Sequence, residues 1–441
     1  MAVCSGAAYA VAAWLSYRLA FALAGIVLVW LPAGLLLGAL LLLDRRLWPF
    51  AIGGAFFGNI GVDLALVGLH WWAFAGAGVN MIESYLSARL LQRFVRPRVT
   101  FDALWDVLGF LGLGLGLANA LAAIPGAWVL TRGRLDNWPM AWVTWWVGDG
   151  MGMLMMTPPV ITLWHAIRAR RSLTSRQVTE RLVSLAIFAG LAVVLLDRRG
   201  DAGIWHPAFV LLPLLMALAI RSGPSLAAIG TLVVYAIAGW HGSDAAYLFA
   251  GPLTSPQKQA MAASAFLALL SITTLITAAI LHEREVALSE ERESQARFRQ
   301  IAEHMREAFF LIEMPSRVPL FVNPPWATIA GRSMSEAYNP SSWFDAVVDE
   351  DRAIVSAGQA ANSRGESSDI SFRITRPTGE RRTLRARTYP IRDDAGRVYR
   401  VVGLAEDIPR SARPKTGCAS RKNWRRWAAW RAVSHMISTI S

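Results

Sequence analysis

Cysteine is almost absent from this chain of 441 residues, since Cys4 and Cys418 are the only two and lie at opposite ends. This scarcity excludes an intrachain disulfide framework and a cysteine-ligated zinc or iron–sulfur centre, and it argues against thiol redox chemistry. Charge is also scarce: 17% of the residues are charged and 54% are hydrophobic. Soluble globular domains carry about 25% charged residues, so the composition excludes an ordinary soluble protein.

The few charges are unevenly distributed along the chain. Residues 1–281 hold 11 acidic and 18 basic side chains, or 29 charges. The 160 residues from His282 to Ser441 hold 20 and 26, or 46 charges. The chain therefore consists of two chemically different pieces, an apolar one followed by a polar one.

Long apolar stretches recur through residues 1–281. A helix needs about 20 mostly apolar residues to cross about 30 Å of hydrocarbon, so we expect eight to ten spans in an all-α multispan bundle. Ala7–Leu23, interrupted by Arg18, is either a further helix or an interfacial segment. The expected spans are Gly25–Leu43, Trp48–Leu69, Trp71–Leu91, Leu104–Leu130, Trp138–His165, Leu182–Leu196, Trp205–Ile220, Pro224–Trp240 and Gln259–Leu281.

Basic residues are concentrated in alternate loops between these stretches, which predicts that those loops face the cytoplasm. The last span then runs inward and places everything after His282 in the cytoplasm. Eight tryptophans lie near expected span ends, where indoles favour the headgroup region, and this interpretation needs no binding role for them. They are Trp14, Trp30, Trp48, Trp71, Trp72, Trp138, Trp205 and Trp240.

Polar residues inside the spans are informative, because each costs free energy unless it is paired or faces water. Asn59 and Asp63 are four residues apart, and Asn80 and Glu83 are three apart, so each pair shares a helix face. Asn119 and Asp149 lie in other spans. Such residues line a polar ligand pocket or an ion path, or they only fix helix packing. Glycines at 109, 112, 114 and 116 lie in an apolar span and predict close helix packing.

Three short segments carry a family resemblance. They are Trp30-Leu-Pro32-Ala-Gly34, Leu47-Trp48-Pro49, and Trp145-Trp146-Val-Gly148-Asp149-Gly-Met-Gly152. With Asn59, Asn80 and Glu83, they resemble the first MASE-type membrane-associated sensor domain, over residues 10–281. Such domains are bacterial inner-membrane input modules fused to histidine kinases, diguanylate cyclases and similar outputs. The resemblance implies that Asp149 first, then Glu83, Asn80 and Asn59, take part in sensing; we add Asp63 as a further candidate.

Residues 282–300 are charged, contain no glycine or proline, and continue the last span. We expect a helical signalling linker here, with Val286, Glu293 and Gln300 at one heptad position of a weak coiled-coil seam. A homodimer would use this seam, but a solvated single helix has the same pattern. His282-Glu283 opens no zinc motif, because Val286 occupies the place of the second histidine.

Residues 301–408 have the size of one compact α+β domain. After a helix over Phe298–Arg306, the pattern predicts an antiparallel sheet with helices on one side. Gly379 and the turn Asp394-Ala-Gly396 separate the last three strands. The expected strands are Ala308–Glu313, Leu320–Val322, Ile370–Ile374, Arg382–Ile391 and Arg397–Asp407, and the expected helices are Pro325–Ala330, Ser335–Tyr338 and Asp351–Asn362.

This second piece resembles a PAS domain with its C-terminal motif. The matching residues are Phe321-Val-Asn323, Gly331-Arg, Val348-Asp-Glu-Asp351-Arg352, Tyr389-Pro-Ile-Arg and Val402-Gly403. We identify no cofactor: the segment has no cysteine for photoactive flavin chemistry, and His304 is a surface or capping residue rather than a haem ligand. The ligand of the domain stays open, with an empty or small-ligand pocket as the default.

The last 33 residues, 409–441, hold eight basic and no acidic side chains, out of a net charge of +13. One interpretation is a basic tail that binds a membrane surface or nucleic acid. The other is a shifted reading frame: codons for Val433–Thr439, regrouped one base earlier, permit Gly-Val-Ser-His-Asp-Phe-Asn, which resembles the phosphoacceptor helix of a histidine kinase. We favour the shifted frame, so His435 is not a phosphoacceptor and no nucleic-acid partner is expected.

These patterns predict a membrane signal sensor, the input part of a two-component histidine kinase, which passes a stimulus through a helical linker to a cytoplasmic PAS domain. Its partners are the lipid bilayer, a second copy and a kinase or other output. No catalytic residue and no metal site is expected, because after Asp407 only 34 residues remain and none forms a nucleotide-binding loop. The alternative is a proton- or solute-coupled transporter with a regulatory PAS domain, for which Glu83 and Asp149 would carry protons.

Overall fold

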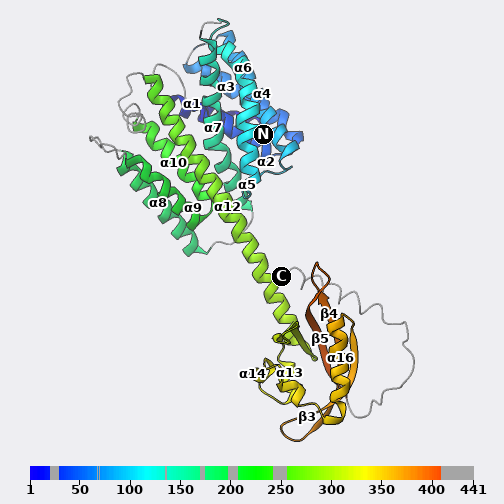
Figure 1. The fold of residues 1–441 in the computed structure, drawn as a ribbon. Coiled ribbons are helices and arrows are strands. Elements are labelled where there is room, and N and C mark those ends of the chain that lie inside the picture. Colours follow the sequence, from blue (N-terminus) through cyan, green and yellow to red (C-terminus); the bar gives the residue numbers. More distant parts are fainter. Residues whose placement is uncertain are drawn as a thin grey trace. The chain divides into compact units, whose positions relative to one another are not determined.

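The computed structural model describes residues 1–19, 29–66, 68, 70–134, 137–168, 174–196, 207–241 and 256–408. The chain separates into two compact units, Met1–Ser289 and Glu290–Ser441. The first unit is helical, and the second is built around a β-sheet (Figure 1). Each unit has its own hydrophobic core.

The first unit is a bundle of helices (Figure 1). A 3-10 turn, η1 (Arg45–Leu47), precedes α3, and another, η3 (Pro207–Val210), precedes α9. The helices are α1 (Ala2–Leu19), α2 (Leu31–Leu42), α3 (Trp48–Leu66), α4 (Trp71–Phe94), α5 (Leu104–Gly109), η2 (Phe110–Ala118), α6 (Asn119–Leu130), α7 (Trp138–Arg168), α8 (Ser175–Leu196), α9 (Leu211–Ser222), α10 (Pro224–His241) and α12 (Pro256–His304).

Four helical stretches of the described residues are long and apolar enough to cross a membrane: Arg45–Leu66, Leu104–Leu130, Ser175–Leu196 and Met261–His304. Three shorter apolar helices, Leu31–Leu42, Leu211–Ser222 and Pro224–Trp240, accompany them. Hydrocarbon solvates such apolar helices while their backbone groups bond internally. The first unit is therefore that of a membrane protein, and the expected total of eight to ten spans stays a prediction.

Glycines bring helix backbones of this bundle into direct contact. A Cβ atom added to Gly54 on α3 would lie 2.0 Å from the carbonyl oxygen of Ala2 on α1. A Cβ atom on Gly34 of α2 would lie 2.3 Å from the carbonyl oxygen of Gly152 on α7. Small residues drive helix association in membranes because they allow such close approach. The bundle is thus held by backbone contacts at α1/α3 and α2/α7.

The helix breakers of the sequence do not end helices here. Pro125 lies inside α6, and Pro158 and Pro159 lie inside α7. The glycine-rich run Phe110–Ala118 forms the π-helical segment η2 between α5 and α6. The expected close packing is confirmed at Gly109, where a Cβ atom would lie 2.3 Å from the Val95 side chain, but it is wrong at Gly112, which has open space.

The second unit is a five-stranded antiparallel sheet in the described part of the chain, with strand order β2-β1-β5-β4-β3. Turns at Gly379 and Gly396, both with positive φ, connect its last three strands, as expected. The strands are β1 (Ala308–Glu313), β2 (Pro319–Val322), β3 (Ser368–Thr375), β4 (Arg381–Arg392) and β5 (Val398–Ile408). Between β2 and β3 lie α13 (Pro325–Ala330), α14 (Met334–Ala337), α15 (Ser342–Asp345), η4 (Asp349–Asp351) and α16 (Arg352–Arg364).

The two faces of this sheet are covered by different parts of the chain. On one face, Phe372, Leu384 and Ala386 pack against side chains from the α13–α16 segment. On the other face, Phe309 and Val402 pack with Phe298 of α12. The end of α12 thus covers the face that the helices between β2 and β3 leave free. The fold is the expected α+β PAS type, although the last turns of α12 lie on the second face of the sheet.

Several expectations fall partly or wholly outside the described residues. The unobserved parts include the start of the Gly25–Leu43 span, the start of the Trp205–Ile220 span, and Trp205 itself. The whole tail from residue 409 to 441 also lies outside them, with both interpretations of its origin. These expectations remain predictions.

Candidate functional site

The membrane unit brings the five predicted site residues together. Asn59 and Asp63 lie on α3, Asn80 and Glu83 on α4, and Asp149 on α7. The Asn59 amide donates to Asp63 Oδ2 at 2.8 Å, and the Asn80 amide donates to Asn59 Oδ1 at 3.0 Å. The spacing of four residues between Asn59 and Asp63 therefore places them in direct contact, as the sequence predicted.

Two tyrosines of α1 extend this polar cluster. The Tyr9 hydroxyl donates to Asn59 Oδ1 at 3.0 Å, and the Tyr17 hydroxyl donates to Asp63 Oδ1 at 3.0 Å. The Trp30 indole donates in turn to the Tyr9 oxygen at 3.3 Å. Neither tyrosine was predicted from the sequence as a site residue. Their separation of eight residues, about two helical turns, was the available signal, because it places them on one face of a helix.

A cavity of about 280 Å³ opens beside the cluster. Its walls come from α1, α3, α4, α6 and α7, together with the segments that precede α2 and α4. Four of the predicted residues line it, and Glu83 adjoins it through Asp149. The lining residues are Tyr17, Trp30, Asn59, Asp63, Gly68, Trp72, Ala73, Gly76, Asn80, Val129, Leu130, Thr144, Trp145, Gly148 and Asp149.

Glu83 and Asp149 are neighbours at this cavity, with the Trp145 indole beside both. Glu83 is fully buried and Asp149 is 6% exposed. Among the described residues, the Glu83 oxygens and Asp149 Oδ2 have no hydrogen-bond partner beyond each other and the Trp145 indole, and Asn80 Oδ1 has none. Buried polar atoms are nearly always paired in folded proteins, so the concentration of poorly paired ones here makes this cavity the candidate site.

No basic side chain of the described residues forms an ion pair with Asp63, Glu83 or Asp149. Arg132 lies against the cavity-lining Trp72, with its guanidinium 4.8 Å from the centre of the Trp72 ring. The imidazole of His70 stacks on Trp72 with 4.3 Å between ring centres. The carboxylates of the cavity therefore lack a fixed counter-charge within the described part of the chain.

The backbone of α7 is shaped to place Asp149 at the cavity. The Trp30 backbone N–H donates to the Gly148 carbonyl at 2.9 Å. A Cβ atom on Gly152 would lie 1.8 Å from the Trp30 carbonyl oxygen, so only glycine fits there. The two glycines of the motif, Gly148 and Gly152, therefore allow the segment before α2 to approach α7 closely. Asp149 of the same motif faces the cavity.

The structure corrects the interpretation of three tryptophans, Trp30, Trp72 and Trp48. Trp14, Trp71 and Trp240 are exposed on the bundle, as expected for residues at a membrane interface. Trp30 and Trp72, however, line the cavity, and Trp30 is only 9% exposed. Their position near a span end does not distinguish an indole facing lipid from one facing a polar interior.

Trp48 and Asn119 serve helix packing. Trp48 is buried, at 4% exposure, and packs edge-on against the Tyr85 ring. Asn119 lies outside the cavity wall, and its amide donates to the Trp146 carbonyl at 2.9 Å. Asn119 therefore joins α6 to α7, which fits the packing interpretation of the polar residues for this position.

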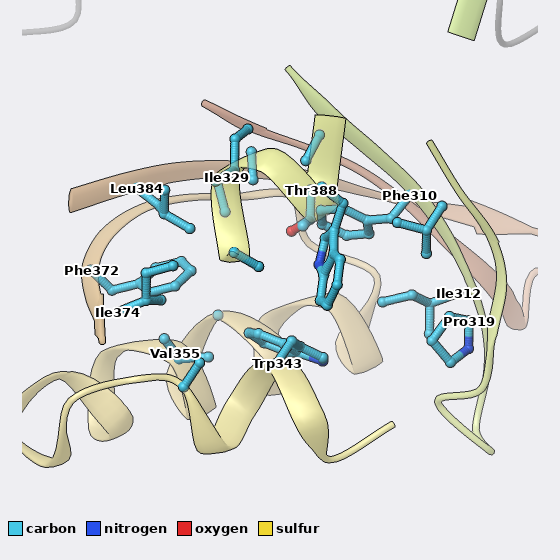
Figure 2. A pocket seen from close by; sticks show the side chains of 18 of the residues that line it. Phe310, Ile312, Pro319, Ile329, Trp343, Val355, Phe372, Ile374, Leu384 and Thr388 are labelled. Atoms are coloured by element: carbon cyan, nitrogen blue, oxygen red, sulfur yellow. The ribbon is translucent and has the colours of Figure 1, made fainter. Parts of the chain in front are cut away.

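A second cavity, of about 130 Å³, lies inside the sheet unit (Figure 2). Figure 2 shows Phe372 and Leu384 of the sheet on one side and Trp343 and Val355 of the helices on the other. Most of its wall is apolar. Its polar part is a chain in which Ser368 and Thr388 hydroxyls are 2.6 Å apart and Thr388 donates to Asn362 Oδ1 at 3.0 Å.

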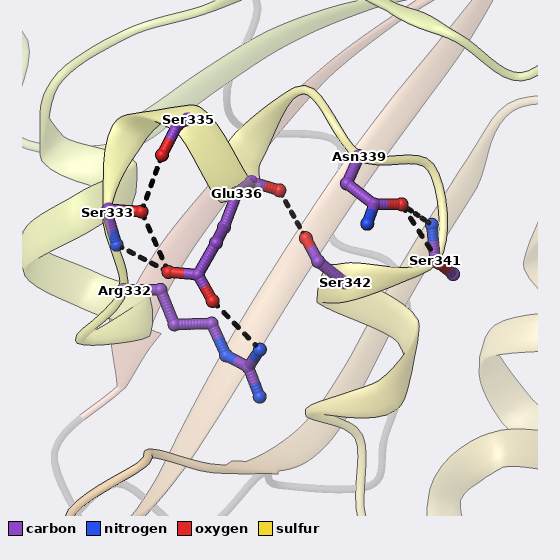
Figure 3. Close-up of polar contacts among 7 residues, drawn as sticks. All are labelled: Arg332, Ser333, Ser335, Glu336, Asn339, Ser341 and Ser342. Carbon is purple, nitrogen blue, oxygen red and sulfur yellow. Dashed lines mark hydrogen bonds and ion pairs between the residues drawn. The ribbon is translucent and has the colours of Figure 1, made fainter.

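The helices that close this second cavity are fixed by local polar contacts (Figure 3). Ser333 and Glu336 form a capping box on α14, in which the Ser333 N–H and hydroxyl hold the pKa of Glu336 below its usual value. The Ser342 hydroxyl donates to the Glu336 carbonyl and so fixes the start of α15, which carries Trp343. Arg332, which lines the cavity, contacts Glu336 at 3.5 Å.

The described residues contain no group of three or more His, Cys, Asp or Glu side chains placed to hold a metal ion. His304 is exposed at the end of α12, with Nδ1 2.9 Å from the Gln300 carbonyl oxygen. It does not line the second cavity. A haem iron bound inside that cavity would therefore not reach this histidine.

Two family models match the chain. The model named MASE1 matches residues 1–285, and a model described as PAS fold matches residues 319–405. No curated protein matches the chain.

Several solved structures are similar to part of the chain. A domain assigned to a light and redox sensing histidine kinase of Haloarcula marismortui is 28% identical, with a TM-score of 0.23, and the match covers 26% of this chain and 99% of that one. The N-terminal domain of a diguanylate cyclase with a PAS/PAC sensor from Marinobacter aquaeolei is 18% identical, with a TM-score of 0.22, covering 23% and 94%. The Rhodobacter sphaeroides LOV protein is 17% identical, with a TM-score of 0.24, covering 27% and 70%.

Proposed function

The chain belongs to the MASE1 family and carries a PAS domain after its membrane unit, and from this premise we propose that it is the input part of a histidine kinase pathway. It lies in the bacterial inner membrane as a multispan protein, with the PAS domain in the cytoplasm. Its parts are a membrane sensor domain over residues 1–281, a signalling linker over 282–300 and the PAS domain over 301–408.

The observation that carries this proposal is the polar cavity of the membrane unit. It unites residues from several helices around Asp149, which is buried and has no basic partner among the described residues. A ligand or charge change at Asp149 acts on α7, which contacts α2 backbone to backbone at Gly152 and Gly34. Close-packed helices have few alternative arrangements, so a local change favours one packing over another. Asp149, Glu83, Asn80, Asn59 and Asp63 are thus the proposed sensing residues.

Transmission is proposed to run through α12, a single helix of 49 residues from Pro256 to His304. Its last turns are bonded to the PAS sheet by Asn323, whose amide donates to the Ala302 carbonyl at 2.9 Å and to the Glu307 carbonyl at 3.0 Å. Asn323 Oδ1 accepts from the Phe309 N–H of β1 at 2.8 Å. A shift or rotation of α12 would therefore act directly on β1.

The output is proposed to be a histidine kinase, reached through a homodimer along residues 282–300. The basic loops of the membrane unit favour a cytoplasmic PAS domain. A phosphoacceptor helix would follow β5 directly if the reading frame shifts after residue 408, as the codons for residues 433–439 permit. Resequencing the gene from the codon for Val401 to about a kilobase past that for Ser441 distinguishes the two cases: a kinase reading frame that continues one base out of register supports the shifted frame, and its absence supports a genuine basic tail.

A chimera tests the sensor role. Residues 1–408 are fused to the dimerisation and catalytic domains of a histidine kinase with a reporter gene, and output is compared at equal membrane abundance. Asp149→Asn is expected to change output several-fold, because it removes a charge at the cavity. The matched control is Glu180→Gln, an exposed acid on α8 paired with Arg176. Equal output from the wild type, Asp149→Asn and Glu83→Gln would contradict the proposal.

A further inference from the structure

The unpaired atoms of the membrane cavity share one chemical property. Among the described residues, Asn80 Oδ1 has no partner, and Glu83 and Asp149 have only each other and the Trp145 N–H, so the cavity presents more acceptor oxygens than donors. A ligand that satisfies them must present N–H or O–H donors. A cationic ligand fits best, because the described residues supply no basic partner for Asp63, Glu83 or Asp149.

Aromatic rings form a second part of the cavity wall. Tyr17, Trp30, Trp72 and Trp145 all line it, and they come from four separate segments of the chain. The face of an indole ring attracts a cation, more strongly when water is excluded, and aromatic walls with carboxylates suit an ammonium group. Arg132 already occupies one face of Trp72 in this manner, at 4.8 Å.

A bare metal ion fits this wall less well than an organic cation does. Hard cations take six or more oxygen ligands, or several carboxylates. The described residues hold no cluster of three or more His, Cys, Asp or Glu side chains suited to a metal. The volume of about 280 Å³ also exceeds the roughly 30 Å³ that one water occupies in the liquid, and it approaches the lower end of small-molecule pockets.

We propose that the cavity binds a small aliphatic ammonium ion, with its N–H groups on Asp149 and Asn80 and its carbon chain between the rings of Trp30, Trp72 and Trp145. This inference rests on the proposed sensor role, for which it supplies the class of stimulus. Glu83 is fully buried beside Asp149 and places a second carboxyl group at the same end of the cavity. The rings exclude water from the other end.

The test is a binding measurement on the full chain in lipid nanodiscs at pH 7.5. Tryptophan fluorescence is titrated with n-butylammonium and with 1,4-diaminobutane, which is a diammonium ion at this pH. The neutral n-butanol and the anionic butyrate serve as probes of equal length. Saturable quenching by the ammonium ions alone is expected. Asp149→Asn should weaken it about tenfold or more, since a buried charged partner contributes several kcal/mol, while Glu180→Gln should bind as the wild type does.

A second variant keeps the proposal testable if Asp149→Asn fails to fold. Asn80→Ala keeps every charge and removes one acceptor, and it should weaken ammonium binding several-fold. Three results would overturn the proposal: no saturable ammonium binding by a folded chain, equal binding of n-butanol, or full competition by sodium at equal concentration. Without ammonium binding, only a proton would remain as the counter-charge of the carboxyl groups. Equal binding of n-butanol would indicate an unselective apolar cavity, and full competition by sodium would indicate an inorganic cation site.

The chimera separates this inference from the sensor role. If Asp149→Asn changes kinase output while no ammonium ion binds, the sensor role holds and the ligand class is wrong. If n-butylammonium binds but leaves the output of the chimera unchanged, and Asp149→Asn also leaves it unchanged, the cavity is a binding site without a sensory role.

Discussion

Glu83 of α4 and Asp149 of α7 are neighbours inside the membrane unit, and among the described residues three of their four carboxylate oxygens have no hydrogen-bond partner beyond each other and the Trp145 indole. No basic side chain of the described residues is paired with either. Two buried acids without a counter-charge are unfavourable for folding. Their arrangement therefore favours a function for the pair over a contribution to stability.

Neutralising this pair should not weaken the bundle. Glu83→Gln and Asp149→Asn keep the shape of each side chain and remove the cost of burying a charge. We expect the free energy of unfolding to stay equal or to rise by up to about 2 kcal/mol. Thermal unfolding in detergent, followed by tryptophan fluorescence, measures this. The contrasting variant is Asn59→Ala, which removes three side-chain hydrogen bonds and should lower the midpoint. A lower midpoint for both acid variants would mean that the pair is structural.

Gly152 should tolerate no side chain. A Cβ atom there would lie 1.8 Å from the carbonyl oxygen of Trp30, and backbone cannot move aside as a flexible side chain can. We expect Gly152→Ala to destabilise the unit by about 1–3 kcal/mol, the usual cost of overpacking. Gly53→Ala on α3 is the matched control, because Gly53 has open space around it. Similar thermal midpoints for the two variants would contradict the observed α2/α7 contact.

Asn323 should control the junction between α12 and the sheet. Its side chain is fully buried and bonds the backbone at Ala302, Glu307 and Phe309. Asn323→Ala leaves these backbone groups unpaired, at a cost of about 1–3 kcal/mol. Hydrogen exchange of the peptides that cover residues 302–309 should become faster, since local opening becomes easier. Asn339→Ala, an exposed loop position, is the control and should leave this exchange unchanged. Unchanged exchange in the Asn323 variant would exclude it as the link.

Asp351 should make the PAS domain sensitive to acid. It accepts from the Arg373 guanidinium at 2.8 and 2.9 Å and from the Arg373 N–H at 2.7 Å, and the guanidinium holds the pKa of Asp351 below its usual value. A lowered pKa in the folded state contributes stability above about pH 4, and this contribution is lost as the pH falls through the folded-state pKa. Asp351→Asn should therefore lower the urea midpoint at pH 7 and flatten its fall between pH 5 and 3. The exposed Asp345→Asn should follow the wild type. Parallel pH profiles for the wild type and Asp351→Asn would contradict this.

The sheet unit was predictable because its signals are local. Alternating apolar residues on each strand and glycines at the two turns located every strand to within two residues. The structure places β4 at Arg381–Arg392, where the sequence predicted Arg382–Ile391. The second face of the sheet was not predictable, since Phe298 reaches it only through tertiary packing.

The cavity was predictable only in part. Helical spacing predicts that Asn59 shares a helix face with Asp63, and Asn80 with Glu83. The rarity of such residues in apolar spans makes them candidates for a site. The contact between α4 and α7 that joins Glu83 to Asp149 has no sequence signal. Trp30 and Trp72 were misassigned because an indole at a span end has the same composition signal whether it faces lipid or a cavity. Gly152 was found only as part of a motif, and its contact with Trp30 explains why glycine is needed.

We propose that the membrane cavity controls the PAS domain through α12, and hydrogen exchange on the full chain in nanodiscs detects such coupling. Exchange is compared between the wild type, Asp149→Asn and the control Glu180→Gln. We expect Asp149→Asn alone to change the exchange of residues 282–304 and of β1. If all three chains exchange alike in these segments while the Asp149→Asn bundle remains folded, the cavity and the PAS domain are not coupled.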